Sequence, residues 1–188
     1  MKRRANIFLA TALLVTLAVP WQPARAAQYT DATAGYTFSY PDDWTVEPYS
    51  DANGSVVTVR NFRAYLHGGS PPMGGAYIAM HSYPPYPSWW PPDTDEYQWL
   101  EKWGQTFNVI VHPSRSIPGP ARLVFTSEST AGPVDTHVSI ALRKGGRLFR
   151  IGLEYQTADL NGPLYEQVLS GIIDSLAPGT QLTATPAA

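Results

Sequence analysis

The chain has 188 residues, of which 44% are hydrophobic and 15% are charged, a composition typical of a globular protein rather than a disordered or fibrous one. It has no cysteine, which excludes disulfide scaffolds, thiol catalysis and cysteine-ligated zinc or iron–sulfur sites. A domain of this length buries enough surface to fold without a disulfide or a structural metal. The 15 glycines and 18 prolines indicate many turns.

Residues 1–26 show the three parts of a secretory signal sequence. Basic residues stand at 2–4, an apolar stretch follows at 7–19, and Ala24-Arg25-Ala26 supplies the small residues that a signal peptidase reads. We expect cleavage between Ala26 and Ala27 and a mature chain that is secreted or otherwise extracytoplasmic. The alternative is an uncleaved membrane anchor, against which the short apolar stretch and the prolines that follow it argue.

Removal of the signal sequence changes the charge of the protein. It takes away 4 of the 13 basic residues and none of the 15 acidic ones, which leaves a net charge of −6. An acidic protein is disfavoured on phosphate backbones and on anionic lipid, so we expect no nucleic-acid partner. No later stretch is apolar and long enough to cross a membrane, so we expect no transmembrane segment in the mature chain.

The spacing of apolar residues predicts a single domain at 27–178 and a flexible C-terminal tail at 179–188. Strands are expected at 36–40, 55–61, 76–82, 109–111, 121–129, 134–144 and 147–156, and an inward alternation resumes at Trp44 and Val46 after the turn at 41–43. Strands and helices do not alternate regularly, so a parallel sheet is not expected. The pattern predicts the α+β class, with an antiparallel β-sheet of about six strands flanked by helices.

Two helices are expected. Asp93 is a good N-cap, with Glu96 three residues on, and it would begin a helix that presents Tyr97, Leu100 and Trp103 on one face. Pro163 suits the first turn of the second helix, and Pro178 would stop it. The buried stripe of this second helix is expected to consist of Leu164, Val168, Leu169, Ile172, Ile173 and Leu176.

The pair Gly145-Gly146 predicts a two-residue hairpin loop that sets Lys144 opposite Arg147. Apolar residues then face each other across the hairpin, in the pairs Leu142–Phe149, Ile140–Ile151 and Val138–Leu153. The same register places polar residues opposite each other on the second face, in the pairs His137–Glu154, Asp135–Gln156 and Ala141–Arg150.

Two ends of the domain resemble the PsbP family and its DcrB-like bacterial relatives. The segment 35–44, which reads GYTFSYPDDW, is similar to the aromatic strand and Tyr-Pro-x-x-Trp corner near the start of that domain. The long hairpin 134–156 and the closing helix that ends in Ile172-Ile173-Asp174-Ser175-Leu176 are similar to its end. The resemblance implies an α-β-α sandwich and a non-enzymatic, extracytoplasmic domain that docks on envelope or membrane proteins.

An aromatic, proline-rich segment follows the third expected strand. We interpret five of its rings as a candidate binding surface for a protein partner or a glycan: Tyr83, Tyr86, Trp89, Trp90 and Trp99. Prolines stiffen the segment, so ordering it on binding costs little entropy. The alternative is a lid whose rings pack on the sheet.

A polar cluster is expected on the outer face of the hairpin, formed by Glu128, His137 and Glu154, with Glu128 beside or diagonal to His137. One histidine and two carboxylates can form a weak metal site or an acid–base pair, but a plain cross-strand charge pair is the interpretation that we favour. No catalytic residue, metal or cofactor is therefore expected. The sequence contains no G-x-S-x-G, H-E-x-x-H, P-loop or dinucleotide motif.

These patterns favour an exported, non-catalytic binding or accessory domain of PsbP-like type, which docks on an envelope or membrane protein. A secreted carbohydrate- or small-ligand-binding module that uses the aromatic segment is the first alternative. An unrecognised hydrolase that uses His137 with carboxylates is the second.

The first testable prediction is export. Because the small residues at 24 and 26 match a signal-peptidase site, N-terminal sequencing of the exported protein should begin at Ala27. Recovery of the full-length chain from carbonate-washed membranes would contradict it.

Overall fold

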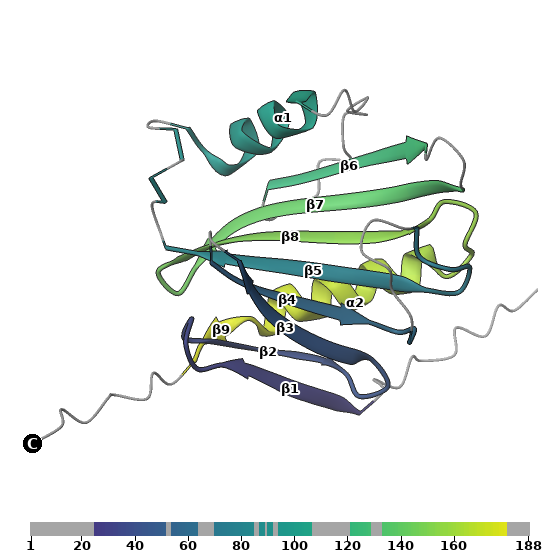
Figure 1. Cartoon of the computed structure of the whole chain (residues 1–188), viewed down its shortest axis with the longest axis horizontal. Coiled ribbons are helices and arrows are strands. Elements are labelled where there is room, and N and C mark those ends of the chain that lie inside the picture. The colour runs from purple at the N-terminus through teal and green to yellow at the C-terminus, as the bar shows by residue number, and fades with distance from the viewer. Residues whose placement is uncertain are drawn as a thin grey trace, which may run out of the picture.

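Nine strands and two helices make up the part of the chain that the computed structural model describes, namely residues 25–51, 54–63, 70–84, 87–88, 90–91, 94–106, 121–128 and 133–179 (Figure 1). The strands of the N-terminal half are β1 (Ala26–Asp31), β2 (Tyr36–Pro41), β3 (Thr45–Asp51), β4 (Gly54–Arg60) and β5 (Ala76–Tyr83). The later elements are α1 (Glu96–Thr106), β6 (Ala121–Glu128), β7 (Val134–Lys144), β8 (Arg147–Gln156), α2 (Gly162–Ser175) and β9 (Ala177–Pro178).

The strands form two antiparallel sheets, which confirms the predicted α+β class. The large sheet has six strands in the order β3-β4-β5-β8-β7-β6, and the small sheet has three in the order β1-β2-β9. Two details differ from the prediction. The aromatic strand β2 belongs to the small sheet, and β1 is an additional strand that the short segment 26–31 did not reveal. β1 forms because β2 offers it a free edge, which no local pattern indicates.

The hairpin of β7 and β8 has the predicted register. Gly145 and Gly146 both adopt positive φ angles, of 57° and 72°, as a two-residue type I′ turn requires. Lys144 pairs with Arg147, and the three expected apolar pairs follow along the strands. The polar pairs expected on the other face are present in the same register.

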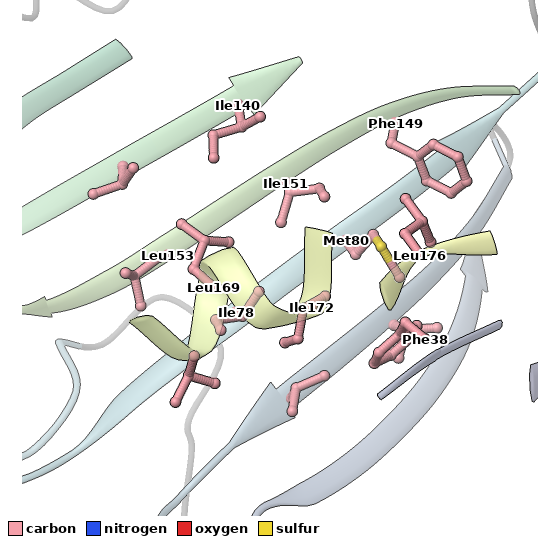
Figure 2. Packing of buried hydrophobic residues seen from close by; sticks show 14 of the residues in the cluster. Phe38, Ile78, Met80, Ile140, Phe149, Ile151, Leu153, Leu169, Ile172 and Leu176 are labelled. Carbon is pink, nitrogen blue, oxygen red and sulfur yellow. The ribbon is translucent and has the colours of Figure 1, made fainter. Parts of the chain in front are cut away.

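α2 covers one face of the large sheet and also contacts β2 of the small sheet (Figure 1). We call the face of the sheet that α2 covers the inner face. Figure 2 shows apolar side chains of β5, β7, β8, α2 and β2 filling the space between these layers. Phe38, Ile78 and Ile151 are completely buried there, so most of the apolar surface that drives folding is concentrated in this layer.

The buried stripe of α2 differs from the predicted one at its first turn. Tyr165 is buried and Leu164 is 39% exposed, although Leu164 was expected to be in the core. Val168, Leu169 and Ile172 are buried as predicted. A helix turns by 100° per residue, so a stripe through residues 165, 168 and 172 leaves position 164 on the flank.

α1 packs over β6 and β7 on the other face of the large sheet, which we call the outer face. Its N-terminal cap lies two residues later than predicted. The backbone N–H of Gln98 donates to Oδ1 of Asp95 at 2.7 Å, and the N–H of Asp95 donates to Oε1 of Gln98 at 3.3 Å. Asp95 is therefore the cap and Glu96 the first helical residue, whereas Asp93 lies outside the described residues. Leu100 is buried as expected.

Several expectations fall on residues outside the described part of the chain. These are the signal sequence up to residue 24, the strand at 109–111, the side chains of Tyr97 and Trp103, and the tail from residue 180. Neither helix in the described part of the chain has the length and hydropathy that crossing a membrane would require.

Replacement of Ile172 by Asp should unfold the protein readily. Ile172 is 1% exposed in the layer between α2 and the large sheet, so the variant would bury an unpaired charge. We expect the free energy of unfolding, measured by urea denaturation, to fall by about 4 kcal/mol. Gln167→Asp, at an exposed position of the same helix, is the control and should change it by less than about 1 kcal/mol. Equal stability of the two variants would show that α2 is not docked as described.

Candidate functional site

A group of polar side chains lies on the outer face of the large sheet, where β5, β8 and β7 are neighbours. The strand pairing places Tyr77 and His137 on either side of Glu154. Nδ1 of His137 lies 3.2 Å from Oε2 of Glu154, and the hydroxyl of Tyr77 donates a hydrogen bond to the same oxygen at 2.7 Å. The expected cross-strand pair of His137 and Glu154 is thus present.

Asp135 is the third member of this group, in place of Glu128. It precedes His137 by two residues on β7 and therefore points to the same face. Ligand atoms of Asp135, His137 and Glu154 all lie within 4.8 Å of one another. We call these three residues the polar cluster.

Glu128 does not lie beside or diagonal to His137, as the sequence suggested. β6 and β7 pair with Glu128 opposite Val134, and the residue opposite His137 is Phe125. No turn motif in the sequence predicted this offset. Asp135 was correctly placed opposite Gln156, but its membership of the cluster required the diagonal neighbour to be considered as well.

The surroundings of Asp135 are unusual for a carboxylate. Its side chain is 4% exposed, and the hydroxyl of Ser70 donates a hydrogen bond to Oδ2. Among the residues that the structure describes, Oδ1 is buried and has no hydrogen-bond partner. Burial raises the pKa of Asp135 above its ordinary value, and the charge of Glu154 adds to this, while Ser70 and His137 act in the opposite direction without outweighing it.

The aromatic segment is a lid where the structure describes it. Trp90 is 9% exposed, its ring stacks on Trp99 with centroids 5.1 Å apart, and its Nε1 donates to the carbonyl of Thr94 at 3.0 Å. The guanidinium of Arg143 lies over the Trp90 ring at 5.1 Å from its centroid. Tyr83 packs in the same cluster and is 6% exposed.

The interpretation of these rings as a contact surface is therefore wrong for Tyr83 and Trp90. A ring that is buried against the sheet cannot offer its face to a partner. Both rings pack against Leu148, an apolar residue on the outer face of β8, and keep it away from water. Tyr86 and Trp89, the other two rings before α1, lie outside the described residues.

Sequence reasoning missed a group of exposed apolar residues at the end of the large sheet where β8 leads into α2, on the right in Figure 1. Four of the five exposed large apolar side chains among the described residues belong to three segments that meet there: Met73, Val134, Leu160 and Leu164. We call these four residues the apolar end. Leu160 is the most prominent, with 95% of its surface exposed.

Asp159 holds these segments together. One of its carboxylate oxygens accepts hydrogen bonds from the backbone N–H of Gly74 at 2.8 Å and from the hydroxyl of Tyr165 at 3.0 Å, and the other accepts one from the N–H of Asn161 at 2.9 Å. Burial by itself would raise the pKa of Asp159, but these hydrogen bonds outweigh it and lower the pKa. Val134 is tied to the same region, because its carbonyl accepts the N–H of Thr157 at 2.8 Å.

The raised pKa of Asp135 leads to a prediction about stability. A carboxyl whose pKa is higher in the folded than in the unfolded state favours folding only while it is protonated, and this contribution is lost as the pH rises through the folded pKa. The side chain of Asn is neutral at every pH, so Asp135→Asn should raise the free energy of unfolding by about 1 kcal/mol at about pH 7. Near about pH 3.5 the variant should bring no gain. Both measurements include a chelator, so that traces of metal do not affect the result. Urea denaturation at both pH values measures this, and a less stable variant at neutral pH would contradict it.

Comparisons with known proteins found similar solved structures but no matching family. No family model matches the sequence, and no curated protein matches it. Among solved structures it is similar to a crystal structure from Bacteroides thetaiotaomicron VPI-5482, with 10% identity over 80% of this chain and a TM-score of 0.44, and it spans about half (47%) of that chain's length. It is also similar to the solution structure of cyanobacterial PsbP from Synechocystis sp. PCC 6803, with 15% identity, coverage of 85% of this chain and 95% of that chain, and a TM-score of 0.48. The predicted α+β class therefore rests on the two antiparallel sheets and the helices of this chain itself.

Proposed function

We propose that the protein is an exported, non-catalytic accessory domain that docks through its apolar end on a protein partner in the envelope or the extracellular space. The observation that carries the proposal is that Met73, Val134, Leu160 and Leu164 are exposed on three segments that hydrogen bonds join at one end of the large sheet. Single exposed apolar residues are common on protein surfaces, but a group contributed by separate segments is typical of an interaction site.

The apolar end is held in place rather than loosely attached. Leu160 follows Asp159 directly, and the hydrogen bonds of Asp159 connect it to Gly74, Asn161 and Tyr165. Backbone segments that are already fixed lose little entropy on binding, so the apolar surface that they carry contributes more fully to affinity.

Export is supported by the basic, apolar and small-residue pattern of residues 1–26. A non-catalytic role is supported by the absence of the common catalytic motifs from the sequence. A protein partner is favoured over a glycan because Tyr83 and Trp90, two of the rings that a sugar would stack on, are buried.

Site-specific photo-crosslinking in the native cells tests the proposal. A photoreactive amino acid in place of Leu160 should give adducts with one or a few proteins, because this side chain would lie in the interface. Leu164→Asp, added to that chain, should weaken the interaction at least about tenfold, which corresponds to about 1.4 kcal/mol, without lowering the melting temperature.

Tyr49 provides the matched control, since it is 46% exposed but lies on β3, opposite Val56 and away from the apolar end. The same photoreactive residue at position 49 should give none of these protein adducts. Adducts with lipid alone at position 160, or identical protein adducts at positions 49 and 160, would overturn the proposal.

A further inference from the structure

We propose that Asp135, His137 and Glu154 bind a divalent transition-metal ion of the zinc type. This inference goes beyond docking at the apolar end and does not depend on it. Three observations carry it: the spacing of the donor atoms, an unpartnered buried oxygen among them, and neighbours that hold the donors in position.

The donor atoms already lie close to the spacing that a metal needs. Zinc binds histidine nitrogen and carboxylate oxygen at about 2.0–2.2 Å in a tetrahedral arrangement, which places neighbouring ligands about 3.4 Å apart. Nδ1 of His137 and Oε2 of Glu154 are 3.2 Å apart, and all three ligand atoms lie within 4.8 Å of one another. Small rotations of the Asp135 and Glu154 side chains would close the remaining gap.

Asp135 supplies the observation that an ordinary charge pair leaves unexplained. A cross-strand pair of His137 and Glu154 needs no third carboxylate, yet Asp135 is 4% exposed beside it. Ser70 occupies Oδ2, while Oδ1 has no partner among the described residues. A buried, unpartnered carboxylate oxygen is costly, and a bound cation would supply both the missing contact and the missing positive charge.

The neighbours of the cluster resemble the outer shell of a metal site. Tyr77 donates a hydrogen bond to Glu154, and Ser70 donates one to Asp135, so each carboxylate is oriented by a hydroxyl. The ligands come from β7 and β8, which are inner strands of the sheet, and such strands position ligands more firmly than loops do.

The same geometry indicates which ion fits. An imidazole with two carboxylates is a donor set that suits zinc and its neighbours, whereas calcium and magnesium prefer oxygen ligands alone. The side chains of His137 and Glu154 are 21% and 15% exposed, so the ion can enter from solvent and a water molecule can complete its coordination.

Zinc binding is measured on the full chain without a polyhistidine tag, after removal of metals with a chelator. Titration with zinc chloride, followed by calorimetry, should show one binding event per chain, and zinc should raise the melting temperature by several degrees in a saturable way. Magnesium and calcium chloride should not. X-ray absorption at the zinc edge should show nitrogen and oxygen ligands at about 2.0 Å and no sulfur.

Variants of the cluster separate a metal site from a structural charge pair. His137→Gln, Glu154→Gln and Asp135→Asn should each weaken zinc binding at least tenfold. Asp135→Asn should at the same time raise the melting temperature of the metal-free protein, so that stability and zinc binding change in opposite directions. A merely structural role of Asp135 would not produce that combination.

Two controls complete the experiment. His81→Gln changes a histidine of the same outer face that faces Arg150 instead of the cluster, and Leu160→Asp changes the apolar end; both should bind zinc like the parent chain. Absence of a saturable response in the parent chain would overturn the proposal, as would unchanged zinc binding in His137→Gln and Glu154→Gln. Loss of docking in Leu160→Asp with normal zinc binding would leave the metal site standing by itself.

Discussion

The register of the β7–β8 hairpin is the constraint on which the rest of the molecule depends. Side chains alternate between the two faces of a strand, so a slip of one residue would exchange the apolar and polar sets. The turn at Gly145 and Gly146 fixes that register for the whole hairpin. It sends Ile151 and its neighbours inward against α2, and it brings His137 opposite Glu154 on the outer face. The core and the polar cluster are two consequences of one turn.

Asp159 plays the corresponding part at the other end of these strands. Its carboxylate joins the start of α2 to the segment that precedes β5, through Asn161, Tyr165 and Gly74. Hydrogen bonds to a charged group contribute about 1.5–3 kcal/mol each, enough together to offset the cost of burying the charge. The lowered pKa of Asp159 reflects this balance. The hydrogen bonds of Asp159 hold the backbone of these loops in place. The exposed side chain of Leu160, the next residue, is therefore attached to a fixed backbone.

The segment before β5 connects the two surfaces that we propose to be functional. Its Ser70 contacts Asp135 of the polar cluster, and its Met73 belongs to the apolar end. Between them, the carbonyl of Pro71 accepts a hydrogen bond from the side chain of Gln156 at 2.7 Å. At the opposite end of the large sheet, Trp90 and Tyr83 cover the outer face instead of presenting rings to solvent. The aromatic residues thus stabilise the sheet where the sequence had suggested a contact surface.

The sequence by itself determined what local rules control. Alternating apolar residues and a glycine pair predicted the antiparallel class, the hairpin and each of its pairs, because strand period and turn type depend on neighbouring residues. Helical spacing predicted most of the buried stripe of α2. The prediction was wrong at Leu164, and the predicted cap of α1 was two residues too early. Tertiary packing can move a helix boundary or rotate a buried stripe by one or two residues.

Only the tertiary structure decided the candidate sites. Ser70 and Asp135 are 65 residues apart in the chain, and Gly74 and Asp159 are 85 apart, so no sequence window contains either contact. The offset of β6 moved Glu128 away from His137, and β1 formed only because β2 offered it an edge. These strand pairings depend on which surfaces pack together when the chain folds. The packing also determines that Oδ1 of Asp135 has no partner among the described residues and that Leu160 stays exposed to water.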